Sequence, residues 1–512
     1  MESKLQRVGI VGAGAMGRGI AQVCAAAGCE AFLFDSAPEA GTRALNFIRE
    51  DLMQAVARGK LAQEDAEATM QRIRPVQELN ALSTCDLVVE AIIEQLDAKQ
   101  RLMRELESIV GPECILATNT SSLSVTAIAA ACGDPGRVVG WHFFNPVPRM
   151  KLVEVIQAPR TRADVAEAML ALSRRVGHRA ILASDSPGFV VNHAGRAFVT
   201  EGLKLLAERT AEAPVLDAIL RSCAGFRMGP LQLLDLTGLD VSVPVMESIH
   251  AQYYGDDRYR PSPLARTRML AGLLGRKSGQ GFYDYREAGA RGAEAAPASP
   301  APSTAATDRS FWWPTDGPAA LPEALAGLLA QAGVRRSSAA EVDVILLSPL
   351  EADLSSTAAT LGLDATKVVG VDPLFSGTGG VTLMACPATG AAAVDAARAA
   401  FATQSIPTFV ISDSPGFVAP RVVACIVNLA CEMAQQGIAS PADIDVAVKL
   451  GLGYPAGPFE WGDRLGAQRV LQVLQGLHAT FNDPRYRPSP WLVRRARLGL
   501  TLSAPDRADS ER

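Results

Sequence analysis

The sequence contains little of what several classes of protein require. Its nine cysteines are scattered and form no CxxC pair, which argues against a disulfide framework and against a zinc site. Charge of neither sign dominates, because 49 Lys and Arg residues face 54 Asp and Glu residues and leave a net charge of −5. No apolar stretch is long enough to span a membrane. We therefore expect no metal, no nucleic-acid partner and no membrane partner.

The N-terminal residues also lack a targeting signal. The run MESKLQRVGIVGAGAMG leads directly into a predicted strand and contains no apolar signal core with a cleavage site. We expect a cytoplasmic protein. With 512 residues, 48% of them hydrophobic, the chain exceeds the size that one core usually organises, so it should form several domains.

The first predicted unit is a strand, a glycine-rich turn, a helix and a second strand. The turn has the GxGxxG pattern, with glycines at positions 12, 14 and 17. Gly12 permits a sharp exit from the strand, Gly14 lets the backbone approach a pyrophosphate, and Gly17 allows the helix to lie close to the strand. Asp35 ends the second strand, where a carboxylate can bind both ribose hydroxyls and repel a 2′-phosphate. The unit predicts NAD rather than NADP; the alternative is an incidental glycine turn beside a surface aspartate.

Further apolar runs predict more parallel strands. Residues 86–92, 115–117 and 138–141 have the continuous apolar character of buried strands and alternate with helical stretches. This alternation predicts a doubly wound α/β sheet of the Rossmann type. Ligands bind such sheets at the carboxyl ends of the strands. Two polar clusters follow strands at that edge, NTSS at 119–122 and HFFNP at 142–146.

A histidine and a glutamate stand out from apolar surroundings. His142 is one of only five histidines in the chain, and an imidazole can accept the hydroxyl proton that leaves during alcohol oxidation by hydride transfer. Glu154 places a carboxylate inside an apolar strand, where an unpaired charge is costly. We predict that Glu154 pairs with His142, fixes its tautomer and stabilises the imidazolium. The alternatives are a satisfied core histidine and a glutamate that faces solvent.

Five motifs follow one another along residues 1 to about 285. They are, in order, GIVGAGAMGRGIA, DLVVEAIIE, NTSSL, HFFNPVPRMKLVEVI and DSPGFVVN. Together they resemble the 3-hydroxyacyl-CoA dehydrogenase family. The resemblance implies that His142 and Glu154 are the catalytic pair. It further implies that Ser121 and Asn192 hydrogen-bond the substrate oxygens and that Asn145 supports the site.

The same resemblance implies a set of residues that bind NAD. Asp35 would bind the adenosine ribose, and Glu94 and Lys99 would lie along the cofactor groove. Three of the implied residues have ordinary alternatives, because Ser121 and Asn192 can be cap or turn residues and Lys99 a solvated surface residue. The implied cofactor residues are Gly12, Gly14, Met16, Gly17, Asp35, Glu94, Lys99 and Asn119.

The first half of the chain should form two domains and a linker. We predict a Rossmann NAD-binding domain over residues 1–186 and an all-α domain over 187–286, which in the family completes the cleft and forms the subunit contact. Residues 287–310 are rich in Ala, Pro and Ser and predict a flexible linker. Two positions depart from the commonest form of the family, because His193 follows Asn192 where relatives have Arg, and GFRMGP replaces a GYPMGP-like run.

The helical domain then occurs a second time. SDSPGFV at 184–190 returns at 412–418, and RYRPSP at 258–263 returns at 485–490. We predict a second all-α domain over residues 412–512. We further predict that the two helical domains pack together as a pseudo-dimer within one chain, replacing the contact that single-copy relatives make between subunits; a homo-oligomer also stays open.

The repeat extends backwards into a degenerate α/β segment, residues 311–411. In this register His142 aligns with Asp372 and Glu154 with Thr382, and no second glycine turn is apparent. We therefore predict that the second copy binds no cofactor and is catalytically silent.

The expected activity is the NAD-dependent oxidation of an (S)-3-hydroxyacyl-CoA to the 3-oxoacyl-CoA. The two-copy form resembles bacterial enzymes of phenylacetate degradation that act on 3-hydroxyadipyl-CoA, and similar chains act on 3-hydroxybutyryl-CoA in fatty acid metabolism, including beta-oxidation. Arg196 or Arg227 can meet a terminal carboxylate, or the CoA phosphates, or solvent. Two other functions stay open: a dehydrogenase of free 3-hydroxy acids, in which a lysine is the base, and a non-catalytic NAD-binding protein.

Overall fold

The computed structural model describes residues 5–286, 309–338 and 342–506. The chain divides into two compact units that do not follow the order of the sequence. The first unit comprises Met1–His193 and Gln436–Leu452, and the second comprises Ala194–Gln435 and Gly453–Arg512. The predicted linker lies outside the described residues except for its last two positions.

An eight-stranded sheet forms the centre of the first unit, in the order β3-β2-β1-β4-β5-β6-β7-β8. Neighbouring strands are parallel except β6 and β7, which are antiparallel. The predicted Rossmann-type sheet is confirmed, and β7 is the exception to its parallel order, because the connection 144–151 is too short for a parallel crossover. The strands are β1 (Arg7–Val11), β2 (Glu30–Phe34), β3 (Ile73–Val76), β4 (Leu87–Glu90), β5 (Ile115–Thr118), β6 (Val138–Phe143), β7 (Leu152–Gln157) and β8 (Arg179–Ser184).

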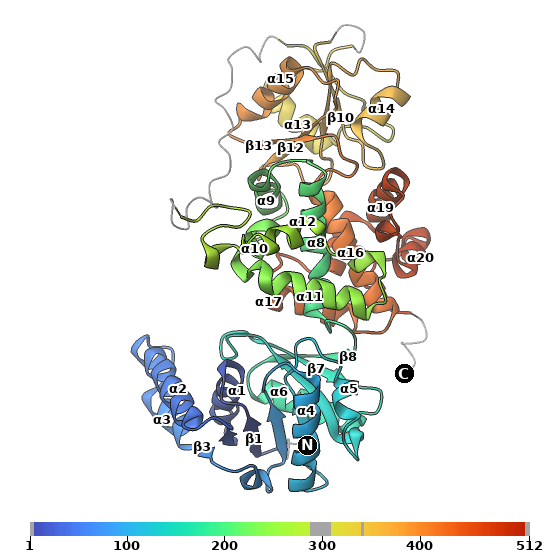
Figure 1. Ribbon diagram of the computed structural model, residues 1–512. Helices are drawn as coiled ribbons and strands as arrows, with labels where there is room; N and C mark the ends of the chain where they lie inside the picture. Colours follow the sequence, from blue (N-terminus) through green and yellow to red (C-terminus); the bar gives the residue numbers. More distant parts are fainter. Residues whose placement is uncertain (1–4, 287–308, 339–341, 507–512) are drawn as a thin grey trace. The chain divides into compact units, whose positions relative to one another are not determined.

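Both faces of this sheet are buried under helices (Figure 1). Along β4, Leu87 and Val89 join the hydrophobic cluster of one face, whereas Val88 joins that of the other, which explains the continuous apolar runs of the sequence. The helices of the unit are α1 (Ala15–Ala26), α2 (Ala40–Ala57), α3 (Gln63–Gln71), α4 (Leu96–Ile109), α5 (Val125–Ala129), α6 (Ala163–Arg175), α7 (Val191–Ala194) and α17 (Pro441–Gly451).

The helices of the two repeats pack against each other in the second unit. The equivalent helices α8 and α16 are in contact, and the buried guanidinium of Arg421 lies 2.5 Å from Oε1 of Glu201. The equivalent rings of Phe226 and Tyr454 meet edge to face with centroids 5.1 Å apart. The helices are α8 (Arg196–Ala207), α9 (Ala213–Ser222), α10 (Pro230–Thr237), α11 (Leu239–Gln252), α12 (Pro263–Leu270), α16 (Ala419–Gln435), α18 (Pro458–Leu465), α19 (Ala467–Phe481) and α20 (Pro490–Leu498).

The predicted degenerate segment forms a shortened α/β sheet in the order β13-β12-β11-β10-β9, again with one antiparallel pair, β11 and β12. This arrangement repeats β4 to β8 of the first sheet, and the residues described in this segment contain no counterpart of β1 to β3, the strands around the glycine turn. The elements, grouped around the sheet in Figure 1, are β9 (Phe311–Trp312), β10 (Val344–Leu347), β11 (Val368–Val371), β12 (Val381–Ala385), β13 (Thr408–Ser412), α13 (Glu323–Gln331), α14 (Leu354–Thr360) and α15 (Ala391–Ala402).

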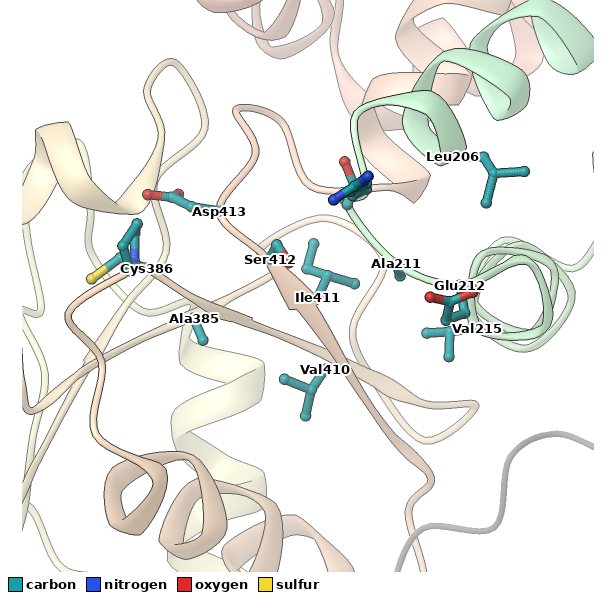
Figure 2. A pocket seen from close by; sticks show the side chains of 13 residues that line it. Leu206, Ala211, Glu212, Val215, Ala385, Cys386, Val410, Ile411, Ser412 and Asp413 are labelled. Atoms are coloured by element: carbon teal, nitrogen blue, oxygen red, sulfur yellow. The ribbon is translucent and has the colours of Figure 1, made fainter. Parts of the chain in front are cut away.

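The last strand of each sheet is hydrogen-bonded at its end to a segment of the other repeat, and we call each of these two places a joint. In the first unit the N–H of Ser184, at the end of β8, donates to the carbonyl of Ile438 at 2.8 Å. In the second unit the N–H of Ser412, at the end of β13, donates to the carbonyl of Thr210, also at 2.8 Å. A cavity of about 920 Å³ lies beside this second joint, with β13 on one side and the segment carrying Ala211 on the other (Figure 2).

Among the described residues, no helix combines the length and the apolar character that a membrane crossing needs.

Candidate active site

The antiparallel pairing of β6 and β7 places the predicted catalytic residues opposite each other. His142 and Glu154 are cross-strand partners, and Nδ1 of His142 lies 2.5 Å from Oε2 of Glu154. The histidine is 4% exposed and the glutamate is fully buried. The structure therefore excludes a solvent-facing Glu154 and provides the partner that its burial requires.

The second carboxylate oxygen is held by the backbone. Oε1 of Glu154 accepts the N–H groups of Val190 at 3.0 Å and Val191 at 2.9 Å, so both oxygens have partners. The rings of Phe144 and Phe189 lie 4.6 and 5.7 Å from the imidazole centroid. In the described part of the chain Nε2 of His142 has no hydrogen-bond partner, which makes it the atom that can accept a substrate proton.

Glu94 organises the NTSS loop that follows β5. Its Oε1 accepts the N–H groups of Ser121 at 2.8 Å and Ser122 at 3.0 Å, together with the hydroxyl of Thr120 at 2.8 Å. Burial acts to raise the pKa of Glu94, but the charge of Lys99 and these hydrogen bonds outweigh it and leave the pKa below its ordinary value. Glu94 thus stays ionised and fixes the loop that carries Ser121.

Lys99 is not a solvated lysine. Its side chain is 1% exposed, and its ammonium lies 2.9 Å from both carboxylate oxygens of Glu90 and 3.3 Å from Glu94. The fully buried Glu90, the last residue of β4, also accepts the hydroxyl of Thr118. Sequence reasoning missed Glu90, although a charge closing an apolar strand is the same signal that pointed to Glu154.

The remaining predicted polar residues lie around the pair at different depths. Oδ1 of Asn119 accepts the N–H of Phe143 at 2.9 Å and so joins the ends of β5 and β6. Nδ2 of Asn192 lies 3.5 Å from the carbonyl oxygen of Ser121, which brings these two residues together. Asn145 is exposed and precedes a cis proline; among the described residues no hydrogen bond joins it to His142 or Glu154.

The glycine turn has the geometry that each glycine predicts. Gly12 has φ +106°, and a Cβ there would lie 2.6 Å from the carbonyl oxygen of Ala91. A Cβ on Gly17 would lie 1.7 Å from the carbonyl oxygen of Gly12, so only glycine lets α1 approach this closely. Apart from Gly14 and its chain neighbours, no described residue has an atom within 4 Å of the position that a Cβ on Gly14 would take, which leaves open the space where a phosphate would approach the backbone.

The end of β2 supports the turn. Oδ2 of Asp35 accepts the N–H of Ala13 at 2.7 Å, and its Oδ1 accepts the N–H of Ala37 at 2.8 Å. No side chain caps α1, and its first turn contains no acidic residue, so the positive end of this helix is available to an anion. Met16, on the first turn, is half-buried. These residues fit a dinucleotide.

The corresponding position in the second unit carries no such pair. Asp372, directly after β11, lies opposite Thr382 on β12, and its N–H donates to the Thr382 carbonyl at 3.1 Å; these are the two residues that the repeat register aligned with His142 and Glu154. Burial raises the pKa of Asp372 to about 7, although the N–H groups of Leu374 and Phe375 donate to its carboxylate and act to lower the pKa. Among the described residues, no group of three or more His, Cys, Asp and Glu side chains could hold a metal ion.

Three features together define a dinucleotide-dependent dehydrogenase. They are a doubly wound sheet, a glycine turn that leads into α1 with its N-terminus open to an anion, and a buried His–Glu pair on two other strands. The comparison with family models is specific: residues 7–186 match the 3-hydroxyacyl-CoA dehydrogenase NAD binding domain, and residues 188–285 and 416–504 match the C-terminal domain. The chain belongs to the 3-hydroxyacyl-CoA dehydrogenase family, and its cofactor is NAD.

Relatives with both copies support this assignment over nearly the whole chain. A protein of Escherichia coli (strain K12) named 3-hydroxyadipyl-CoA dehydrogenase is 37% identical over 498 residues, 97% of this chain and 99% of its own. A crystal structure of 3-hydroxybutyryl-CoA dehydrogenase from E. coli K12 has a TM-score of 0.86 at 37% identity and the same coverage. A probable 3-hydroxybutyryl-CoA dehydrogenase of Deinococcus radiodurans, 42% identical, covers 54% of this chain and 100% of its own, the length of a single copy.

Proposed function

We propose that the chain oxidises the 3-hydroxyl of an (S)-3-hydroxyacyl-CoA and that His142 and Glu154 are its catalytic pair. The observation that carries the proposal is the buried contact of 2.5 Å between Nδ1 and Oε2. Because Glu154 occupies Nδ1, the tautomer that presents a lone pair on Nε2 is favoured, and Nε2 accepts the hydroxyl proton. The adjacent carboxylate stabilises the imidazolium that results.

Other residues of the chain bind and orient the reacting groups. When bound, NAD supplies the nicotinamide ring that takes the hydride from C3. Gly12, Gly14 and Gly17 would let the pyrophosphate approach the N-terminus of α1, and Asp35 would bind the adenosine ribose. Met16, Asn119, Glu94 and Lys99 would complete the groove, the last two by holding the strand ends in place.

Ser121 and Asn192 are proposed to contact the substrate oxygens. The Ser121 hydroxyl can donate to the C3 oxygen as that atom gains carbonyl character, and the Asn192 amide can both donate and accept. Their proximity in the structure supports a shared role. Asn145, exposed beside the pair, is proposed to orient the substrate and not the histidine.

The substrate is proposed to carry a short or dicarboxylic acyl chain, as in 3-hydroxybutyryl-CoA or 3-hydroxyadipyl-CoA. The support is the two-copy architecture, shared over 97% of the chain with a relative named for the dicarboxylic substrate. Such an activity would serve phenylacetate degradation or fatty acid beta-oxidation. We further propose a cytoplasmic enzyme, in keeping with nine free cysteines, in which the packed helical repeats replace the subunit contact of single-copy relatives.

Formation of NADH from three substrates tests the proposal. The purified full chain is assayed with 3-hydroxybutyryl-CoA, 3-hydroxyadipyl-CoA and a long-chain 3-hydroxyacyl-CoA, with NAD and with NADP. We expect a higher kcat/KM for one of the two shorter substrates and a preference for NAD. Faster oxidation of a free 3-hydroxy acid than of its CoA ester would contradict the proposal, as would silence with all three esters.

A further inference from the structure

A helix of the second copy belongs to the compact unit that contains the first copy's catalytic pair. The segment Gln436–Leu452 separates from the other helices of its repeat and joins the first α/β domain. Its helix α17 contacts β7 and β8, and β7 is the strand that carries Glu154. Residues of α17 are buried there, including Ile444, Ala447 and Val448.

The beginning of this segment is fixed by hydrogen bonds at the end of β8. The N–H of Ser184 donates to the carbonyl of Ile438 at 2.8 Å, and the Ser184 hydroxyl donates to the carbonyl of Gly437 at 3.0 Å. Both bonds involve the backbone of the second copy, so they tie the segment to the sheet whatever side chains it carries there. The other end of α17 is therefore held in a defined position.

That other end reaches the residues that hold Glu154. A Cβ on Gly451, the last residue of α17, would lie 2.9 Å from Cγ2 of Val191 and 3.1 Å from Cδ2 of Leu152. Val191 donates its N–H to Oε1 of Glu154 at 2.9 Å, and Leu152 begins the strand on which Glu154 lies. Gly451 thus packs directly against Val191 and Leu152, two residues that fix the position of the Glu154 carboxylate.

The second unit contains the same joint with side chains of different size. Cys223 stands 228 positions before Gly451, and Ala419 stands 228 positions after Val191. In the first unit these two positions hold the large side chain of Val191 and the glycine Gly451, which has none. In the second unit Ala419 and Cys223 both carry small side chains. The Cys223 sulfur lies 3.1 Å from the position of a Cβ on Gly380, the counterpart of Leu152. Cys223 therefore lies against the residue that precedes β12, as Gly451 lies against the residue that begins β7, and only in the first unit does this contact adjoin the proposed catalytic pair.

We propose that Gly451 of the second copy is a positioning residue for the His142–Glu154 pair of the first. The catalytically degenerate repeat thereby sets the geometry of the intact site through the end of α17. This inference rests on the proposed function for its kinetic readout, because a change in Glu154 position is seen in kcat only if the pair transfers the substrate proton.

The test compares Gly451→Ala and Gly451→Val with the wild-type full chain. Both side chains must displace Val191 or Leu152, and a misplacement near 1 Å at a reacting group can reduce the rate about 100-fold. We expect kcat to fall up to about 100-fold for Gly451→Val and less for Gly451→Ala. The KM for NAD should change little, since β4, β5 and β6 separate β7 from the strand before the glycine turn.

Proton NMR gives a second readout that does not depend on turnover. The Nδ1 proton of His142, shared with Glu154 over a short distance, should resonate far downfield, and His142→Gln identifies the signal among five histidines. In both Gly451 variants this signal should move or broaden. If the His142 signal changes in the Gly451 variants but the wild-type chain oxidises none of the 3-hydroxyacyl-CoA substrates, the positioning role is upheld and only the proposed function is rejected.

Cys223→Val is the matched control, because it enlarges the side chain at the equivalent position beside the silent Asp372. It should leave kcat and the His142 signal unchanged. Gly451→Ala guards against simple unfolding, since alanine has a higher helix propensity than glycine. Wild-type kcat and an unmoved His142 signal in both Gly451 variants would overturn the inference, and so would equal losses in the Cys223 variant.

Discussion

The two copies keep the same strand pairing around positions whose chemistry has diverged completely. In the first unit β6 and β7 set His142 against Glu154, and in the second β11 and β12 set Asp372 against Thr382. In the described part of the second copy the sheet has no counterpart of β1 to β3, the strands that hold the glycine turn in the first. The comparison shows that the strand pairing is kept in both copies for reasons of folding that do not depend on catalysis.

Those separate requirements are visible in polar residues that both copies keep. Asp185 accepts the N–H and hydroxyl of Thr126 near the start of α5, and Asp413 accepts the N–H and hydroxyl of Ser355 near the start of α14. Such bonds satisfy N–H groups at a helix start. They stabilise the fold in either copy, whereas a His–Glu pair has a use only where a cofactor binds.

The largest expected effect comes from removing the proposed base, His142, of the first copy. His142→Gln should reduce kcat by about 10⁴-fold or more while NAD binding is largely kept, because the glutamine cannot accept a proton from the substrate. Steady-state kinetics and NAD titration measure the two effects. His478→Gln, on the exposed side of α19, is the matched control, and near-normal turnover of the His142 variant would reject the assignment.

A smaller loss is expected from neutralising the partner of the base. In Glu154→Gln the amide NH₂ would donate to Nδ1, which places the ring proton on Nε2 and removes the lone pair that accepts the substrate proton. We expect kcat to fall about 10³-fold, with little change in the melting temperature because the amide oxygen can still accept from Val190 and Val191. An unchanged kcat would show that Glu154 is structural only.

The next effect is a loss of stability, expected when the buried ion pairs between the two repeats are removed. Arg421 is fully buried, pairs with Glu201 and Glu208 of the first repeat, and donates to the hydroxyl of Tyr486 at 2.8 Å. Arg421→Met leaves the buried Glu201 carboxylate without its cation, which costs about 3–5 kcal/mol in comparable cases. Thermal unfolding measures the loss. Arg494→Met, exposed on α20, should be neutral, and equal stability of the two variants would contradict the expected role.

The sequence predicted those features that depend on neighbouring residues or on a repeat. Three glycines at fixed spacing predicted the turn, because a Cβ on Gly12 or Gly17 would clash with backbone atoms and Gly14 leaves the space beside the backbone open. A charge within an apolar run identified Glu154, and the repeat register aligned Asp372 with His142 and Thr382 with Glu154. The site roles of Ser121, Asn145 and Asn192 stay predictions.

The features that sequence reasoning missed depend on which segments meet in the folded chain. Nothing local in 436–452 indicates that this helix joins the first α/β domain, because its apolar face fits either repeat equally well by pattern. Lys99 reads as a surface residue until the structure shows Glu90 beneath it. The antiparallel direction of β7 follows from a short connection, which single-strand patterns do not reveal.

The smallest expected effect concerns the buried carboxyl that replaces the base in the second copy. Burial raises the pKa of Asp372 from 3.8 to about 7, so the folded state favours the neutral form. For this group stability is full below the ordinary pKa and is lost progressively as the pH rises toward 7. Asp372→Asn cannot ionise and should therefore show a free energy of unfolding that depends less on pH, by a few kcal/mol between acidic and alkaline conditions.

Chemical unfolding of the wild type and of Asp372→Asn across that pH range measures how steeply the free energy of unfolding of each protein depends on pH. Asp395→Asn, at an exposed position of α15, is the control for the general effect of removing a carboxylate. Turnover should be unchanged in both variants, because the second copy lacks the residues of the glycine turn and of the proton acceptor. Loss of activity in Asp372→Asn with stability intact would show that the degenerate copy contributes chemistry of its own. Equal pH slopes in all three proteins would show instead that Asp372 finds a partner or water in solution, since only an ionisable group buried without compensation produces the expected dependence.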